Sequence, residues 1–299
     1  YRYADSLATA SIAAGGTLGI LIPPSVILVI YGILTEQSIG KLFMAGFLPG
    51  FLGILLYTLA VYFVVTRNPS LGPAGERTAW PQRLLALKDV WTTLSLFIFV
   101  IGGIYIGVFS ATEAAGMGAA GALLITFFKG NLTGGVLLEV SREAALLTAK
   151  LFALLFGASM FSNFLNRAGF PDALLDIINY FQLSGLSVIL LILLIYILLG
   201  CVFESMSMIL LTVPIFAPLV HTLGFDLIWF GILVVVVTEI SLITPPIGLN
   251  VFVLKGVIKD VPVSTIFRGV TPFWIVDILR LGLIAFIPSL ALFLPSMMY

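Results

Sequence analysis

The chain has few side chains that carry out chemistry. Only 9% of its 299 residues are charged, the net charge is zero, and Cys201 and His221 are the single cysteine and histidine. One cysteine excludes an internal disulfide, and a balanced charge gives no basic patch for nucleic acid. The sequence contains no Walker motif and no His-Glu-x-x-His or similar constellation. We therefore expect neither an enzyme nor an ATP-driven pump.

Apolar residues make up 61% of the chain, and the mean hydropathy is +1.20. Long apolar runs at residues 47–65, 94–108, 186–199 and 227–237 are typical of membrane spans, and they lack the alternation of a membrane barrel. The sequence therefore predicts an all-α polytopic membrane protein.

The Lys and Arg residues predict the topology. Most fall at the same ends of the expected spans, and only Lys41 and Arg167 fall at the opposite ends. The positive-inside rule then places residues 67–88 and 130–150 in the cytoplasm, with residues 133–150 as an amphipathic helix at the membrane interface. The expected spans are residues 11–35, 42–66, 88–109, 113–129, 151–169, 226–258 and 270–297.

Two proline pairs interrupt apolar stretches in matching surroundings, LIPPS at residues 21–25 and ITPPI at residues 243–247. A tandem proline removes backbone donors that a helix in lipid needs. Either pair alone could be a simple kink. Duplicated broken helices, in contrast, are typical of secondary transporters.

Residues 184–222 contain a third interruption, where the polar residues 204–207 separate two short apolar arms. Each arm is shorter than the ~20 residues of a full span, so we expect a re-entrant hairpin rather than two crossings. The two Pro-Pro helices then run in opposite directions. A shared Gly-x-x-Pro entry into the next helix, at residues 46–49 and 269–272, extends this inverted repeat.

Three segments in combination resemble the large membrane subunit of tripartite ATP-independent periplasmic (TRAP) transporters. They are AGGTLGILIPPS at residues 14–25, GGIYIGVFSATEAA at residues 102–115 and TPPIGLN at residues 244–250. The resemblance covers essentially the whole chain. It implies an elevator-type symporter of the bacterial inner membrane, in which sodium drives a mobile transport domain past a fixed scaffold. It also implies two partners, a small membrane (Q) subunit and a periplasmic substrate-binding protein.

Family members carry further sequence upstream, so we expect an N-terminally incomplete chain that begins in the tail of an inner hairpin, residues 1–15. We assign residues 1–66 to the first repeat of the transport domain and residues 184–299 to the second. Residues 67–183 are assigned to a linker, scaffold helices and the interfacial helix. Glu204 departs from the family pattern, in which an aspartate is more usual, and this weakens any substrate inference from the hairpin tip.

Sodium requires hard oxygen ligands, and two groups of residues offer them where helices are expected to unwind. In the first repeat these are backbone carbonyls around glycines, and in the second they are side chains of the hairpin tip and the broken helix. Close helix packing by small residues is the alternative interpretation. The candidate sodium ligands are Gly15, Gly16, Thr17, Gly19, Ser205, Ser207, Thr238, Glu239, Ser241 and Thr244.

After each proline pair a new helix begins, and its free N–H groups and positive dipole end favour an anion. No Lys or Arg lies near either break, so a carboxylate would depend on these groups. Asn250 could equally form a hydrogen bond between helices. The candidate substrate contacts are Pro24, Ser25, Thr244, Pro246 and Asn250.

Three charged residues fall deep in expected spans. Glu239 lies about 20 Å past Asp226 along its helix. It is a candidate for cation coupling or for orienting the ion site or, alternatively, a structural carboxylate bonded to the adjacent hairpin. Asp277 and Arg280 lie on one helical face and are expected to pair with each other.

These features together predict sodium-coupled import of a small organic anion by an inverted-repeat, elevator-type transporter. Candidate substrates are a C4-dicarboxylate, a 2-oxo acid or an acidic sugar such as sialic acid. The alternatives are an ion or anion channel and a structural membrane subunit without transport activity of its own. Saturable, sodium-dependent uptake rather than ohmic flux would distinguish a transporter from a channel.

Overall fold

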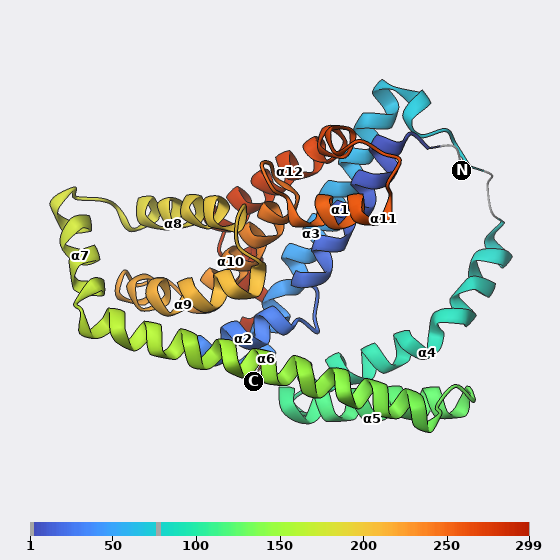
Figure 1. Ribbon diagram of the computed structural model, residues 1–299, viewed down its shortest axis with the longest axis horizontal. Coiled ribbons are helices and arrows are strands. Elements are labelled where there is room, and N and C mark those ends of the chain that lie inside the picture. Colours follow the sequence, from blue (N-terminus) through green and yellow to red (C-terminus); the bar gives the residue numbers. More distant parts are fainter. Residues whose placement is uncertain (1–2, 76–78, 299) are drawn as a thin grey trace. The chain divides into compact units, whose positions relative to one another are not determined.

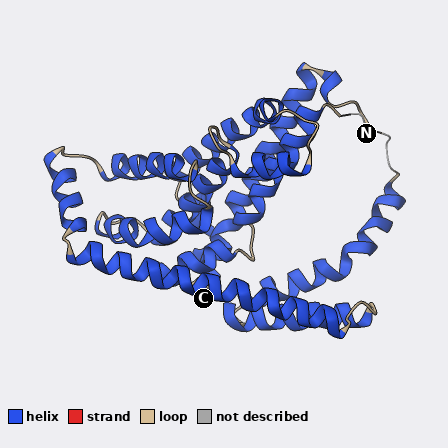
Figure 2. Ribbon diagram, in the orientation of Figure 1, coloured by secondary structure: helices blue, strands red, loops and turns tan. Residues whose placement is uncertain are grey.

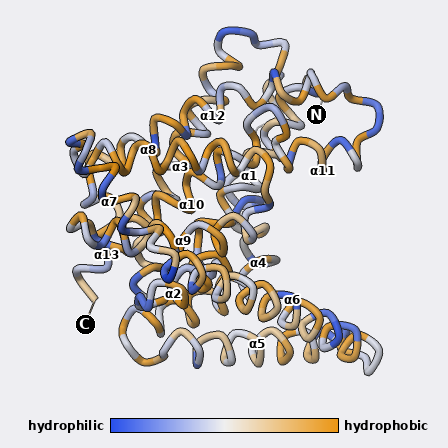
Figure 3. Tube along the Cα trace, turned by 60° about the vertical axis from the view of Figure 1, so that its left-hand side comes forward, coloured by the Kyte–Doolittle hydropathy of each residue, from blue (hydrophilic) through white to orange (hydrophobic). Residues whose placement is uncertain are grey.

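The computed structural model describes residues 3–75 and 79–298, and the regular elements in this part of the chain are all helical (Figure 2). Outside the described residues lie residues 1–2, 76–78 and 299. The predicted domains include these residues. Six helical stretches in the described part are long and apolar enough to cross a membrane. Hydrophilic residues gather in the turns and at helix ends (Figure 3). The prediction of an all-α polytopic membrane protein is confirmed.

The chain divides into two compact units. Unit 1 comprises Tyr1–Ala74 and Ala158–Ser296, and unit 2 comprises Gly75–Gly157 and Met297–Tyr299. The helices, labelled in Figure 1, are α1 (Asp5–Leu21), α2 (Val26–Thr35), α3 (Ile39–Arg67), the short 3₁₀ helix η1 (Pro69–Leu71), α4 (Trp80–Tyr105), α5 (Ala111–Phe128), α6 (Gly134–Arg167), α7 (Phe170–Tyr180), α8 (Gly185–Gly200), α9 (Ser205–Thr222), α10 (Leu227–Ile243), α11 (Leu249–Val257), α12 (Val263–Phe286) and α13 (Ser289–Ser296).

In unit 2, α4 and α5 pack against each other. A capping box begins α5, since the Ser110 hydroxyl accepts from the Glu113 N–H at 3.3 Å and the Glu113 carboxylate accepts from the Ser110 N–H at 2.8 Å. These reciprocal bonds satisfy donors that the first helical turn leaves free. The start of α5 is therefore fixed locally by its own sequence.

The structure corrects the expected division of residues 133–169. An interfacial helix over residues 133–150 and a separate span over residues 151–169 were expected, but α6 runs without a break from Gly134 to Arg167. No proline or turn sequence interrupts it, and charged residues on one face are compatible with a continuous helix. The polar and apolar parts are therefore two portions of one 34-residue helix.

The centre of unit 1 is α10, in which all residues from Ile228 to Ile243 are buried. It packs against α1, α3, α8, α9 and α12. At its first turn, the Trp229 Nε1–H donates to the Ile284 carbonyl at 2.8 Å, and the Tyr31 hydroxyl donates to the Leu227 carbonyl at 2.6 Å. A helix that is apolar on every side is stable only when it is enclosed on every side. The surrounding helices thus enclose α10 up to the start of the second Pro-Pro break, whose two prolines are exposed.

Candidate functional site

The first helix break lies at residues 22–25, between α1 and α2. Its two prolines have no N–H, so the carbonyls of Gly19 and Ile20, four residues earlier, lose their helical donors. The Ser25 hydroxyl donates a hydrogen bond to the Ile20 carbonyl. Ser25 also caps α2 by accepting from the Leu28 N–H at 3.3 Å. The Gly19 carbonyl, in contrast, receives neither a helical N–H nor a hydrogen bond from Ser25.

The second break lies at residues 244–248, between α10 and α11. Here the prolines remove the helical donors of the Ser241 and Leu242 carbonyls. The Thr244 hydroxyl donates to the Ile240 carbonyl at 2.5 Å. Gly248 then begins α11 with φ of 57°, a left-handed conformation that glycine adopts without strain. Both expected breaks are confirmed, and in both the Pro–Pro peptide bond is cis.

Two buried hydroxyls precede the second break. Thr238 Oγ1 donates to the Val234 carbonyl and Ser241 Oγ donates to the Thr238 carbonyl, each at 2.7 Å. Because these hydrogens are committed to the helix, the hydroxyl oxygens keep lone pairs that can accept a further donor or bind a cation. The end of α10 therefore presents oxygen atoms in an otherwise apolar environment.

The turn between α8 and α9 contacts the second break. The Cys201 Sγ lies 3.6 Å from the Pro245 carbonyl oxygen. Gly200 lies so close to Ser241 that a Cβ added to it would overlap the serine side chain. Figure 1 shows α8 and α9 running in opposite directions from a shared turn, and the two helices are in contact. Since the turn ends at the level of the break, the geometry agrees with the expected hairpin.

The predicted tip residues occupy the start of α9 rather than the turn itself. Glu204 caps this helix, with its carboxylate accepting from the N–H of Met206 at 3.0 Å and that of Ser207 at 3.2 Å. Ser205 is buried in the first turn and Ser207 is half-buried. A carboxylate near a helix N-terminus is a favourable cap, so Glu204 has a structural role at the tip.

Asn250 links the helix after the second break to the middle of α1. Its Nδ2 donates to the Ala13 carbonyl of α1 at 3.2 Å. A Cβ added to Gly16, one turn further along α1, would lie 4.0 Å from the same nitrogen. Asn250 therefore makes the interhelical hydrogen bond that was the alternative to ligand contact, and it holds the start of α11 against α1.

The structure corrects the expectation that the chain unwinds at residues 15–19. Gly15, Gly16 and Thr17 lie inside the continuous helix α1, where their carbonyls accept helical hydrogen bonds. The Thr17 hydroxyl donates to the Ala14 carbonyl at 2.7 Å and lies 3.3 Å from the Tyr57 hydroxyl. Glycine permits unwinding, but only the prolines enforce it. The break is therefore displaced toward residues 22–25, and Pro24 and Pro246 are both exposed there.

A buried charge cluster joins α10 to α12. Arg280 donates to the Glu239 carboxylate, its Nη2 lies 3.0 Å from Asp277 Oδ1, and the Tyr57 hydroxyl donates to Asp277 Oδ2. Glu239, Asp277 and Arg280 are all 0% exposed. A Cβ added to Gly53 on α3 would overlap the guanidinium, so this glycine makes room for it. Two carboxylates thus share one cation at a fully buried position.

The charge cluster shows which residues Glu239 contacts. The expected Asp277–Arg280 pair is confirmed, but Glu239 bonds to the same arginine and not to the hairpin. Glu239 thus makes a buried ion pair with α12, and its role in cation coupling stays a prediction. Tyr57 was not foreseen. The available signal was a tyrosine in the middle of an apolar span, where a buried hydroxyl requires a partner.

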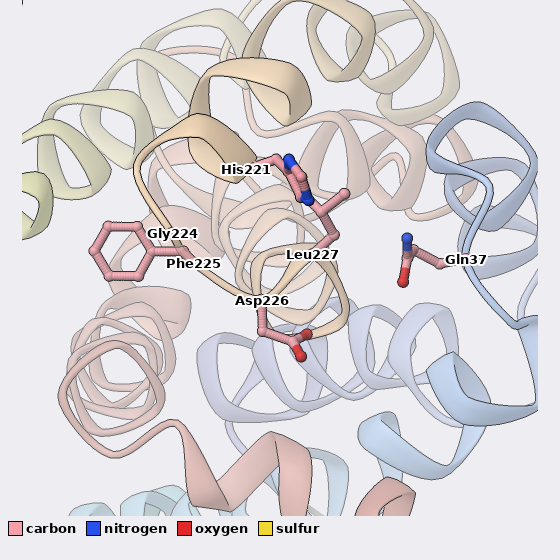
Figure 4. Close-up of a pocket in the computed structure, with 6 residues that line it drawn as sticks. All are labelled: Gln37, His221, Gly224, Phe225, Asp226 and Leu227. Carbon is pink, nitrogen blue, oxygen red and sulfur yellow. The ribbon is translucent and has the colours of Figure 1, made fainter.

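Within the described part of the chain, no three His, Cys, Asp or Glu side chains come together in a way that would bind a metal ion. A cavity of about 410 Å³ opens at the other end of α10, lined by Gln37 and by residues of the α9–α10 connection (Figure 4). Among them, Asp226 caps α10 by accepting from the N–H of Ile228 at 2.7 Å and of Trp229 at 3.1 Å. About 25 Å of helix separates this cavity from the second break, and the predicted site residues do not line it.

Two broken helices and a helix turn that contacts the second break are the main features of this site. Residues 1–290 match the family described as "Tripartite ATP-independent periplasmic transporter, DctM component". The chain belongs to this TRAP permease family. The matched region contains both breaks and the hairpin.

Curated relatives agree with the family assignment. The C4-dicarboxylate TRAP transporter large permease protein DctM of Pseudomonas aeruginosa is 34% identical over 98% of this chain and 68% of its own length. The sialic acid TRAP transporter large permease protein SiaM of Vibrio cholerae is 33% identical over 99% of this chain and 69% of its own length. The ectoine/5-hydroxyectoine TRAP transporter large permease protein UehC of Ruegeria pomeroyi is 31% identical over 99% of this chain and 69% of its own length. This TRAP permease chain is therefore similar to transport proteins named for several different substrates.

Proposed function

We propose that this chain is the large permease of a sodium-coupled TRAP transporter that imports a small organic anion across a bacterial inner membrane. A small membrane (Q) subunit and a periplasmic substrate-binding protein are its proposed partners. The observation that carries the proposal is the contact between the α8–α9 turn and the second break, through Cys201 and Pro245. This contact and the close approach of Gly200 to Ser241 bring the oxygen-bearing end of α10 against the turn that leads into α9.

For sodium, we propose a subset of the candidate ligands. The Gly19 and Ser241 carbonyls occupy equivalent positions four residues before the first proline of each break. Both lack a helical donor for the same reason, the missing proline N–H. Side-chain oxygens of the second repeat complete the proposed set, namely Ser205, Ser207, Thr238 and Thr244. Glu239 is proposed to position α10 through Arg280 rather than to bind the ion.

For the substrate, we propose a carboxylate held at the N-termini of α2 and α11. Relatives are named for C4-dicarboxylate, sialic acid and ectoine, compounds that each carry a carboxylate. Ser25 and Asn250 lie at these two helix starts, and no cationic side chain is needed there because the free N–H groups and the helix dipoles favour an anion. The proposed mechanism is an elevator in which residues 1–66 and 184–299 move against a scaffold formed by residues 67–183.

The test is substrate uptake by proteoliposomes that contain the complete complex, across a panel of organic acids, with and without an inward sodium gradient. We expect Thr238→Val to raise the sodium concentration for half-maximal uptake by about tenfold, since one oxygen ligand of a cation is lost. Thr58→Val is the matched control, because the Thr58 hydroxyl makes the same bond to the carbonyl four residues earlier, at 2.8 Å, on an exposed part of α3. An uptake rate that is the same with and without the sodium gradient would refute the proposed sodium coupling. Equal effects of the two substitutions would refute the proposed ligand.

A further inference from the structure

An apolar groove of about 660 Å³ lies between α3 and α12, away from both breaks. Its walls are residues between 56 and 64 of α3 and between 268 and 276 of α12. Ala60, which is 6% exposed, lies at its floor, and Pro272 interrupts the backbone bonding of α12 beside it. A small side chain opposite a proline leaves space that neighbouring side chains do not fill. The volume falls in the range of about 300–1,000 Å³ typical of ligand sites.

The chemistry of the lining is aliphatic and aromatic except at one end. Phe63 and Ile275 are more than half exposed along the groove, at 55% and 51%. The hydroxyl of Thr271, which also lines it, donates to the carbonyl of Phe267 at 3.0 Å. The Thr271 hydroxyl is therefore hydrogen-bonded within its own helix and does not require water in the groove. A hydrocarbon chain fits these walls better than a polar solute.

Two arginines lie at the polar end of the groove. Arg268 lines it directly, and the Arg67 guanidinium lies over the ring of the lining residue Phe63, 4.3 Å from its centroid. No acidic residue belongs to the lining. In the described part of the chain, neither guanidinium forms an ion pair with a carboxylate. The groove thus ends in uncompensated positive charge.

The two arginines lie where the headgroups of the cytoplasmic leaflet are expected. Arg67 closes the last turn of α3 and Arg268 lies in the second turn of α12, so both are at the ends of apolar helices. The positive-inside rule assigns this end to the cytoplasm, where anionic lipid headgroups attract Lys and Arg. Arginine also matches a phosphate in geometry, through paired N–H donors.

We propose that the α3–α12 groove binds one anionic phospholipid of the cytoplasmic leaflet. An acyl chain lies along the apolar walls, and the phosphate lies between Arg67 and Arg268. The site is distinct from the proposed substrate and sodium positions, since it lies on the outer faces of α3 and α12.

The test uses the delipidated full-length permease complex in detergent, titrated with palmitoyl-oleoyl phosphatidylglycerol or phosphatidylcholine and examined by native mass spectrometry. Each arginine near the membrane surface strengthens anionic-lipid binding by about 1 kcal/mol, which is a factor of about five. We expect Arg67→Gln/Arg268→Gln to lose phosphatidylglycerol affinity about 30-fold and phosphatidylcholine affinity by a clearly smaller factor, because phosphatidylcholine has the same phosphate but no net charge. The control pair Arg142→Gln/Lys150→Gln removes two exposed cationic side chains from α6 and should leave both affinities unchanged.

A second variant tests the acyl chain independently of charge. Ala60→Phe fills the groove, and we expect it to lower the affinity for both lipids at least tenfold. Glycerol phosphate, which has the headgroup charge without a chain, should not displace phosphatidylglycerol. A monodisperse gel-filtration peak and an unchanged melting temperature show that a variant is folded.

Three results would overturn the proposal. The first is equal loss of phosphatidylglycerol binding in the groove and control pairs, which would indicate a general surface effect. The second is displacement by glycerol phosphate, which would indicate a site for a free anion. The third is efficient crosslinking from a cysteine at Leu59, 51% exposed in the groove, to another subunit or to another segment of the permease. That result would show that protein and not lipid occupies the groove.

Discussion

Replacing Arg280 with methionine should destabilise the permease more than any other substitution in the charge cluster. The side chain is 0% exposed and is the cation shared by Glu239 and Asp277, which are also 0% exposed. Methionine keeps much of the volume but removes the charge and the donors. Two carboxylates then remain buried without a counter-ion.

The magnitude follows from the geometry. Removing one partner of a buried ion pair costs about 3–5 kcal/mol, because the remaining charge has lost its compensation. Glu239→Gln should cost less, about 1.5–3 kcal/mol, since it loses a charge-assisted hydrogen bond but leaves Arg280 and Asp277 balanced one to one. The double variant Arg280→Met/Glu239→Gln should be more stable than Arg280→Met alone, with a coupling energy of about 1–3 kcal/mol.

The assay is reversible unfolding in mixed micelles with increasing mole fraction of a denaturing detergent. Tryptophan fluorescence is a suitable readout, because Trp229 is buried in α10 and bonded to α12. Arg142→Met, on an exposed part of α6, is the matched control and should change the free energy of unfolding by less than about 0.5 kcal/mol.

The reasoning is refuted if Arg280→Met costs less than about 1 kcal/mol, which is well below the about 3–5 kcal/mol expected when one partner of a buried ion pair is removed. It is also refuted if Glu239→Gln is as damaging as Arg280→Met. That order would mean that Glu239 has a role beyond its bond to the arginine, such as binding the coupling ion.

Three further substitutions test close contacts. Gly53→Ala places a methyl group where the guanidinium lies and should lower the free energy of unfolding by about 1–3 kcal/mol, measured in the same micelle assay. Gly200→Ala should push the hairpin turn away from Ser241 and reduce initial uptake at least tenfold in proteoliposomes; unchanged uptake would contradict the role of this contact. Glu204→Ala removes the cap of α9 and should cost about 1 kcal/mol, seen as faster hydrogen exchange in its first turn, whereas Glu204→Asp should preserve protection.

The two helix breaks could be predicted from the sequence, because each depends on the missing N–H groups of its prolines. A missing N–H acts on residues four positions away, so both helix breaks were correctly placed by local reasoning alone. The turn between two short apolar helices was also placed, because polar residues separate the helices, while the re-entrant course of this pair stays a prediction. In α6 the same reasoning failed. A change from polar to apolar composition was interpreted as a boundary, although a helix ends only where its backbone bonding stops.

At the site, sequence spacing predicted the Asp277–Arg280 pair because both residues lie on one helical face. The bond from Arg280 to Glu239 spans two helices, and that from Tyr57 to Asp277 joins positions 220 residues apart. Contacts of this kind depend on how helices pack, and no local pattern encodes them. The same applies to Asn250, whose partner is the carbonyl of Ala13.

The charge cluster also constrains how the chain enters the bilayer during synthesis. Glu239 leaves the ribosome well before Arg280, so α10 presents an uncompensated carboxylate to the insertion machinery until α12 has been made. A lone charged residue at the centre of a helix opposes insertion by about 2.5–3.5 kcal/mol. We expect α10 and α12 to leave the translocon together, as a neutralised pair, so the second half of this permease is assembled as a helix group rather than one span at a time.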